Sequence, residues 1–194
     1  MNKWFVCRAQ LKSTSLVAAG VLLGLALTSL LSRDTPAAAQ DKAAVGAEQR
    51  LRQLKLELPD VSKPTNTLVN AVRVGDMLYV SGTGPGKGVV GRLGQDYDVP
   101  QGKAAARQVG LQILAVVKAE LGSLDKVERL VKTLGMVNAT PDFKQHPQVI
   151  NGFSDLMVEV FGEEHGKSAR SAVGMSSLPG GIPVEIECIF QLRK

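Results

Sequence analysis

The sequence predicts an α+β fold in which two helices pack on one face of a single β-sheet. Two long segments carry apolar residues at helical spacing, and short segments with the composition of β-strands come before, between and after them. The predicted order is strand, strand, strand, helix, strand, helix, strand, strand. A fold of this class buries the apolar side of its helices against one face of the sheet.

The first 39 residues are predicted to be a leader. Basic residues at the start precede sixteen uncharged residues, 16–31, and an Ala-x-Ala sequence at 37–39, which is the order of a secretory signal peptide. The apolar run is shorter than the roughly 20 residues of a membrane-spanning helix. An uncleaved membrane anchor formed by residues 16–31 is the alternative. Both interpretations predict an exported domain, either periplasmic or extracellular.

Composition without the leader excludes several classes of function. Residues 1–39 hold four of the 23 basic and one of the 18 acidic residues, so the remainder has 19 basic against 17 acidic residues, a net charge of +2. With six aromatic residues left, this balance argues against a nucleic-acid partner. Cys188 is then the only cysteine, so no intrachain disulfide can form. His146 and His165 have no second thiol near them, and we expect no zinc site.

The folded domain is predicted to span residues 64–194. Residues 40–63 are interpreted as a polar linker that becomes helical from Ala47. Pro59 and Pro64 end that helix, because proline removes a backbone donor and fixes the backbone.

Strands and a helix then follow one another. Residues 69–80 are predicted to form a hairpin around Gly75-Asp76, and residues 88–93, with the sequence GVVGRL, offer a third short strand. Apolar residues at helical spacing predict a helix over 101–121, with Gly122 at its C-terminal cap.

In the second half of the domain, the spacing of apolar residues again changes between that of a strand and that of a helix. A strand is predicted over 127–138, and two strands, 168–178 and 183–192, close the chain. Between them lies a second amphipathic helix with Pro147 near its start. Its apolar stripe comprises Val149, Ile150, Phe153, Met157, Val160 and Phe161.

A glycine-rich loop, LYVSGTGPGKGVVG at 78–91, raises the question of a phosphate site. A P-loop needs four residues between its two glycines and a hydroxyl after the lysine. Here three residues separate Gly82 from Gly86, and Lys87 is followed by Gly88. The next residues are typical of a strand and not of the helix that would receive a phosphate. We interpret the loop as a connection in which glycines supply positive φ.

Polar residues in the last two strands are the candidate site. Glu185 and Glu187 share one face of their strand, opposite a row of apolar residues. Arg170 shares a face with Ala172 and Gly174, which leave space beside the guanidinium. The arginine could bind a carboxylate and a glutamate could orient water. The alternative is a cross-strand ion pair on a solvated face.

Three other polar positions give weaker indications of function than Arg170 and Glu185. Ser81 has no histidine partner in a recognisable motif, which argues against a serine nucleophile. Cys188 alternates with core positions and is interpreted as a buried small apolar residue. Asn138 begins an Asn-Ala-Thr glycosylation sequon, a short pattern that often arises by chance.

The closing sequence ARSAVGMSSLPGGIPVEIECI, at 169–189, strongly resembles the signature of the reactive-intermediate deaminase A family, also named RidA, YjgF or endoribonuclease L-PSP. Three further segments match in the family's order, and together they cover residues 64–192. These segments are VRVGDMLYVSGTGP at 72–85, VGLQILAVVKAELGSLDKVERLVK at 109–132 and VINGFSDLMVEVFG at 149–162. The amino-acid sequence of these segments is most similar to a branch of the family whose activity is less settled than that of the founding deaminases.

The resemblance implies a chorismate-mutase-like α+β fold and a homotrimer with clefts between subunits. It implies hydrolysis of enamines and imines such as 2-aminoacrylate to 2-oxo acids and ammonia, with no metal or cofactor. Arg170 falls on the family arginine that grips the substrate carboxylate, and Glu185 on the glutamate that positions water. Ser81, Gly82 and Asn151 fall on cleft residues that contact the substrate.

Three departures from the family pattern leave a second function open. Leu68 replaces a tyrosine, Thr83 replaces a glutamine, and Ala172 replaces a cysteine. The cleft would keep its carboxylate anchor and its glutamate but lose hydroxyl and amide contacts. The alternative is a non-catalytic trimer that binds a small carboxylate. A ribonuclease, as the older family name suggests, is disfavoured by the nearly neutral charge.

Overall fold

Five strands form one mixed sheet in the order β1-β2-β5-β3-β4. The computed structural model describes residues 45–61, 63–64 and 67–194, so the predicted leader lies outside the described residues. The strands are β1 (Ala71–Val74), β2 (Met77–Thr83), β3 (Val127–Asn138), β4 (Ala169–Met175) and β5 (Val184–Leu192). The β3 and β4 strands are parallel, and every other neighbouring pair is antiparallel.

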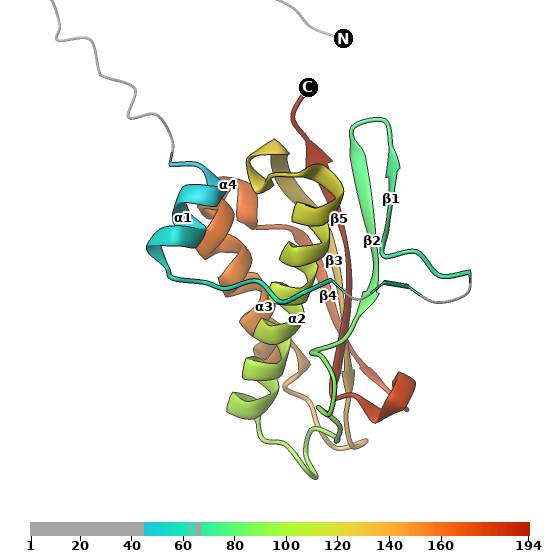
Figure 1. Ribbon diagram of the computed structural model, residues 1–194. Helices are drawn as coiled ribbons and strands as arrows, with labels where there is room; N and C mark the ends of the chain where they lie inside the picture. Colours follow the sequence, from blue (N-terminus) through green and yellow to red (C-terminus); the bar gives the residue numbers. More distant parts are fainter. Residues whose placement is uncertain (1–44, 62, 65–66) are drawn as a thin grey trace, which may run out of the picture. The chain divides into compact units, whose positions relative to one another are not determined.

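Two long helices cover one face of this sheet. Figure 1 shows α2 (Val99–Leu121) and α3 (His146–Phe161) side by side in front of the strands. Two shorter helices, α1 (Ala47–Gln53) and α4 (Glu163–Gly166), contact α3. This arrangement confirms the predicted α+β class, with one sheet and its two main helices on one face.

Local sequence signals set the ends of α2. The Asp98 side chain accepts a hydrogen bond from the backbone N–H of Gln101, and the Gln101 side chain accepts one from the backbone N–H of Asp98. This capping box satisfies two of the donors that a helix start leaves without partners. At the other end, Gly122 has a φ of 79°, in the left-handed region that favours glycine. The helix therefore begins two residues earlier than predicted and ends at the predicted residue.

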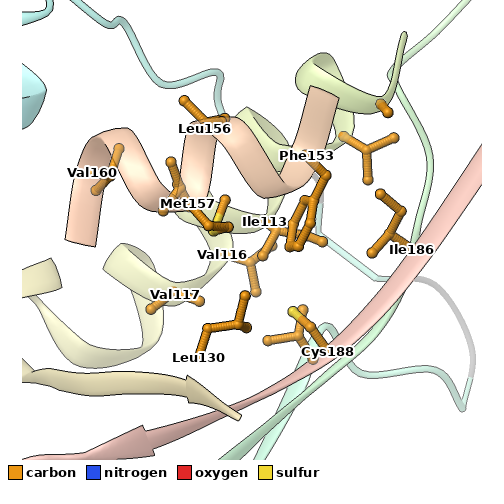
Figure 2. Close-up of a cluster of buried hydrophobic side chains, with 14 of the residues drawn as sticks. Ile113, Val116, Val117, Leu130, Phe153, Leu156, Met157, Val160, Ile186 and Cys188 are labelled. Carbon is orange, nitrogen blue, oxygen red and sulfur yellow. The ribbon is translucent and has the colours of Figure 1, made fainter. Parts of the chain in front are cut away.

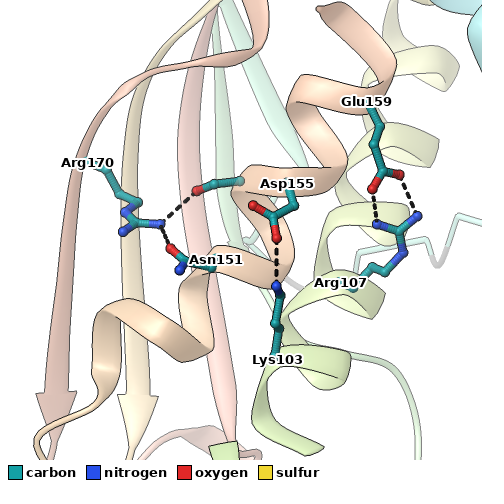
Figure 3. Close-up of polar contacts among 7 residues, drawn as sticks. Lys103, Arg107, Asn151, Asp155, Glu159 and Arg170 are labelled. Atoms are coloured by element: carbon teal, nitrogen blue, oxygen red, sulfur yellow. Dashed lines mark hydrogen bonds and ion pairs between the residues drawn. The ribbon is translucent and has the colours of Figure 1, made fainter. Parts of the chain in front are cut away.

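The core lies between the two helices and the inner face of the sheet. Figure 2 shows side chains from α2, α3, β3 and β5 meeting there, and all six residues of the predicted α3 stripe are buried. Gly152 allows α3 to approach α2 closely, since a Cβ at this position would overlap the backbone carbonyl of Lys103. On the outer side, Lys103 pairs with Asp155 and Arg107 with Glu159 (Figure 3).

The predicted third strand at residues 88–93 is wrong. Only Leu93 pairs, in isolated bridges with Tyr97 and Ala139. The reason is the backbone conformation of the glycines, because Gly88 has a φ of 79° and Gly91 a φ of 142°. A strand needs extended backbone at successive residues, so these glycines divide the apolar residues that suggested a strand.

The region predicted as a linker contains a docked helix. The predicted start of helix at Ala47 is confirmed, and Ala47 and Leu51 are buried against the domain. The Glu48 carboxylate accepts hydrogen bonds from the Lys118 ammonium at 2.8 Å and from the backbone N–H of Leu124 at 3.0 Å. The segment is therefore fixed by both apolar and charged contacts. Among the described residues, no helix is both long and apolar enough to cross a membrane.

Candidate functional site

Arg170 lies on the edge strand β4 and reaches toward α3 (Figure 3). Its Nη1 donates hydrogen bonds to Asn151 Oδ1 and to Ser154 Oγ, both at 2.9 Å. The side chain is half-buried. Two acceptors on one nitrogen fix the plane of the guanidinium, and both come from one rigid helix. The arginine is thus positioned before any ligand arrives.

The strand register explains why Arg170 faces the helix. Arg170 pairs with Thr133, which is fully buried on the helix-covered face of β3. Residues opposite each other in a sheet point to the same side. On α3, Asn151 and Ser154 are three residues apart and therefore lie on one side of the helix. The sequence analysis did not predict Ser154, and its i, i+3 spacing from Asn151 on an amphipathic helix is the signal that could have indicated it.

Glu185 lies on the opposite, open face of the sheet. Its neighbours in β5, Val184 and Ile186, are fully buried under the helices, so the alternation of the strand turns Glu185 away from them. Burial raises the pKa of the Glu185 carboxyl above its usual value, and the negative charge of Glu187 raises that pKa further. Glu185 and Glu187 share this face, as the sequence predicted.

A bulge in β2 brings the main chain close to Glu185. The pairing of β2 with β5 shifts between Val80 and Thr83, so Ser81 and Gly82 together stand opposite Glu187. A Cβ at Gly82 would overlap Glu185 Oε1. Glycine at this position therefore leaves the space that the carboxylate occupies. The Ser81 hydroxyl donates to the backbone carbonyl of Val69 at 2.6 Å, which holds the bulge against the preceding segment.

The candidate residues form two separate groups within one chain. Glu185, Ser81 and Gly82 lie together at β2 and β5, whereas Arg170 and Asn151 lie together at β4 and α3. The β3 strand stands between β5 and β4, and the two groups are on opposite faces of the sheet. The alternative of a direct cross-strand ion pair between the last two strands is therefore wrong, since these strands are not neighbours.

The open face of the sheet is apolar over much of its area. A cavity of about 360 Å³ lies on it, lined among others by Tyr79, Ser81, Lys132, Glu187 and Ile189. Five large apolar side chains of β1, β2 and β4 are exposed, namely Val72, Val74, Tyr79, Val173 and Met175. An exposed apolar patch of this extent indicates an interaction surface.

The structure shows what surrounds each of the three residues that depart from the family pattern. Leu68 is 58% exposed and precedes the sheet. The Thr83 hydroxyl donates to the backbone carbonyl of Ser81 at 2.9 Å, so it supports the bulge. Ala172 faces the helices and packs against the core. None of these side chains can supply the contacts of a tyrosine hydroxyl, a glutamine amide or a cysteine thiol at its position.

Two further sequence features have structural explanations. Asn138 of the glycosylation sequon is buried, and its Nδ2 donates to the carbonyls of Gly91 and Ile182, so the folded protein cannot present this amide for glycan attachment. Cys188 is buried, and burial raises the pKa of its thiol well above the usual range, which keeps it an inert thiol. Within the part of the chain that the structure describes, no cluster of three or more potential metal-ligating side chains occurs.

Comparison with known proteins agrees with this architecture. Residues 48–189 match the family described as "YjgF/chorismate_mutase-like, putative endoribonuclease". The chain belongs to this family. The recognition based on the closing motif is confirmed, and the matched region begins with α1.

Three relatives resemble most of the chain. Protein TCP17 of Trypanosoma cruzi is 42% identical over 147 residues, which cover 74% of this chain and 92% of that protein. A crystal structure of a protein of unknown function from Agrobacterium tumefaciens is 40% identical, with a TM-score of 0.68, over 75% of this chain and 91% of the other. A structure from Shewanella oneidensis that carries the same endoribonuclease description is 30% identical, with a TM-score of 0.72, over 76% and 99%.

Proposed function

We propose that this protein hydrolyses small imines or enamines that carry a carboxylate, such as 2-aminoacrylate, to 2-oxo acids and ammonia. The reaction takes place in clefts between the subunits of a homotrimer, and it uses no cofactor. Family membership supports this chemistry in general terms, and the observation that carries it for this chain is the prearranged Arg170.

Arg170 suits the recognition of a carboxylate. Both of its hydrogen bonds within the described chain come from Nη1, so the edge formed by Nη2 and Nε is left for a ligand. A guanidinium edge matches the two oxygens of a carboxylate in bidentate geometry. Because Asn151 and Ser154 hold the group in place, little side-chain entropy is lost on binding.

Glu185 suits the activation of water. An imine carbon is already electrophilic, so hydrolysis needs an oriented water and a group that accepts a proton. Glu185 in its ionised form takes a proton from water as the oxygen bonds to the imine carbon, and it passes that proton to the nitrogen, which gives a carbinolamine. Glu185 then takes the hydroxyl proton as the carbonyl forms and transfers it to the nitrogen as the C–N bond breaks, so ammonia leaves and the carboxylate is regenerated. An enamine enters this sequence after tautomerising to the imine.

A second subunit is required for both groups to reach one substrate. Arg170 faces α3 and Glu185 faces the open side of the sheet, with β3 between their strands. The exposed apolar residues of the open face are suited to be buried between copies of the chain. In a cyclic trimer each cleft would take Arg170 from one subunit and Glu185, Ser81 and Gly82 from the next.

The direct test is an imine-loss assay. An amino-acid oxidase generates 2-imino acids in the presence of a trapping reagent, and their disappearance is followed with and without the purified protein. Arg170→Ala is expected to lower kcat/KM about 10- to 100-fold, the loss of charge-assisted hydrogen bonds to the carboxylate. Arg107→Ala, which removes an arginine paired with Glu159 on the outer helix surface, should leave the rate unchanged. Wild type no faster than Arg170→Ala refutes the proposal.

Shared clefts make a separate prediction about mixed subunits. Arg170→Ala and Glu185→Gln trimers should each have kcat/KM lowered at least about tenfold when they are alone. In co-expressed mixed trimers about a quarter of the clefts combine an intact arginine with an intact glutamate, and activity should return in proportion. Mixtures that stay inactive would show that the two residues do not act across a subunit boundary.

The second candidate function is a binding module without turnover. The observation that favours it is the loss of cleft side-chain contacts at Leu68, Thr83 and Ala172. At Thr83, for example, the hydroxyl hydrogen-bonds the backbone carbonyl of Ser81 and is not directed to a ligand. This module would be stabilised against heat by 2-oxobutyrate in a manner that depends on Arg170, while imine loss would match the protein-free rate. Stabilisation together with turnover favours the hydrolase.

A further inference from the structure

A further cavity, with several polar side chains in its lining, lies where β3 and β4 end and α3 begins. Its volume is about 440 Å³, and its polar lining comes from Arg92, Thr140, His146 and Ser176. Gly174, which also lines it, is four residues from Arg170, so the two sites are separated by about 13 Å along β4. The cavity is therefore distinct from the proposed cleft, and its occupant is independent of the proposed function.

Arg92 brings an uncompensated positive charge to this cavity. Its Nη2 donates to the backbone carbonyl of Ala139 at 2.8 Å, which fixes the side chain. Its Nε is buried and has no hydrogen-bond partner among the described residues. The ion pairs of the described residues do not include Arg92, and the nearby Asp96 carboxylate accepts instead from the Arg92 backbone N–H at 2.8 Å. A positioned guanidinium without a paired carboxylate favours an anionic ligand.

The start of α3 adds to the positive potential. His146 is the first residue of this helix, Gln145 at the N-cap makes no side-chain capping bond, and the first turn holds no acidic residue. The partial positive charge of the helix end therefore remains uncompensated by its own sequence. Burial lowers the pKa of His146, which keeps its imidazole neutral near pH 7 and able to donate one hydrogen bond. Phe143 packs edge-on against this ring, with 5.3 Å between centroids.

The remaining wall of the cavity is apolar, from Ala139, Pro141, Phe143 and Met175. We propose that this cavity binds a small organic anion, a carboxylate or a phosphate ester, whose charged group contacts Arg92 and the start of α3. Phe143 and Met175 contact its apolar part. A few polar groups that fix a charged end, within otherwise apolar walls, are the usual composition of a small-molecule site.

Calorimetric titration of the full-length protein with three related probes tests this site. Benzoate and phenyl phosphate carry the two anionic groups, and benzamide is a neutral analogue of benzoate. All titrations use the Arg170→Gln background, so that the other carboxylate site does not contribute. We expect saturable binding of one probe molecule per chain for at least one anion and no binding of benzamide. Comparison of benzoate with phenyl phosphate identifies the preferred group.

Two arginine variants distinguish binding at Arg92 from a general effect of removing one positive charge. Adding Arg92→Gln should weaken binding at least about tenfold, as expected for a lost charge-assisted hydrogen bond. Adding Arg107→Gln removes the same charge from the outer surface and should have no effect. Equal losses in both variants, equal binding of benzamide, or no saturable binding of either anion would overturn the proposal.

Two further measurements test the site if Arg92→Gln fails to fold: binding to the Gly174→Ala variant, and NMR of the histidine rings. A Cβ at residue 174 would lie 2.5 Å from His146 Nε2, so the alanine forces the imidazole out of its present position in the cavity wall without changing any charge. Binding should fall in this variant as well. The chain has two histidines, His146 and His165. Bound anion should shift the ring signals of His146 and leave those of His165 in place, whereas equal shifts of both contradict the assignment.

Discussion

Glu185 is the residue whose titration bears most directly on the proposed hydrolysis. Its pKa is raised by burial and then by the charge of Glu187, so the carboxylate forms at higher pH than for a free glutamate. The acid limb of kcat/KM against pH should therefore lie above pH 4.5. Glu187→Gln removes one cause of the shift and should move that limb to lower pH, without abolishing activity. A limb that stays in place in Glu187→Gln means that another group controls it.

The same shift has a consequence for stability. A carboxyl group with a raised pKa in the folded state binds protons more tightly folded than unfolded, so stability falls as pH rises from 4.5 through the folded pKa. Glu185→Gln should remove this fall. Chemical denaturation of both proteins across this pH range measures the difference, which should be small below pH 4.5 and in favour of the variant above it. Equal pH dependence in the two proteins would contradict the shift.

Residue identity alone predicted part of the candidate site. Strand alternation placed Arg170 and Glu185 on defined faces, because side chains alternate with a period of two. Alternation cannot say which strands are neighbours, and so it left open an ion pair that the intervening β3 excludes. Ser154 was missed because its role depends on how α3 crosses β4. Gly82 was matched by resemblance, but the physical need for glycine became visible only with the Glu185 carboxylate beside it.

At the scale of elements, the close contact between α2 and α3 depends on glycines, and most directly on the missing Cβ of Gly152. Gly152 faces the backbone carbonyl of Lys103, and a methyl group there would force the helices apart. Gly152→Ala should lower the free energy of unfolding by about 2 kcal/mol or more, despite the better helix propensity of alanine. Urea denaturation followed by circular dichroism measures this. Gly122→Ser, at an exposed left-handed cap, should cost less, about 1 kcal/mol.

The docking of α1 makes a further prediction about Glu48. Burial alone would raise the pKa of its carboxyl, but hydrogen bonds from Lys118 and Leu124, together with the charges of Lys118 and Arg52, lower it overall. A lowered folded pKa contributes stability above pH 4.5 that is lost as pH falls through the folded pKa. Glu48→Gln should therefore destabilise the protein by about 1 kcal/mol at pH 7 and by less near pH 3.

A matched exposed carboxylate provides the control for that experiment. Glu164→Gln should change stability little at either pH, since Glu164 is exposed. A pH-independent effect of Glu48→Gln would show that the ion pair is not what fixes α1. The sequence predicted this helix from Ala47, yet not its docking, because seven residues with two buried side chains give a weak periodic signal.

For the whole molecule, the period of apolar residues was enough to predict the class of fold. Long amphipathic helices and alternating strands produce strong signals, and β3 has the bounds expected from sequence. The error at residues 88–93 arose where β-branched residues are interspersed with glycines of positive φ. Composition cannot distinguish such a loop from a strand, since the backbone conformation of each glycine is set by its surroundings. The proposed sharing of one cleft between two chains is also beyond what the residue pattern of one chain can predict.

The open face of the sheet provides the last prediction, which concerns assembly. Val72 is 48% exposed, pairs with Tyr79 across β1 and β2, and lines the cavity on this face. A glutamate at this position would place an unpaired charge in the proposed subunit interface, which is strongly unfavourable once buried. Val72→Glu should therefore give a folded monomer without imine-hydrolysing activity, as measured by light scattering after size-exclusion chromatography. Val90→Glu changes another exposed valine, which lies outside the sheet, and this variant should remain a trimer. If both variants have the mass of the wild type and that mass is a trimer, the open face is not the interface. If the wild type is itself a monomer, the shared cleft cannot form, and the proposed hydrolysis loses its structural basis.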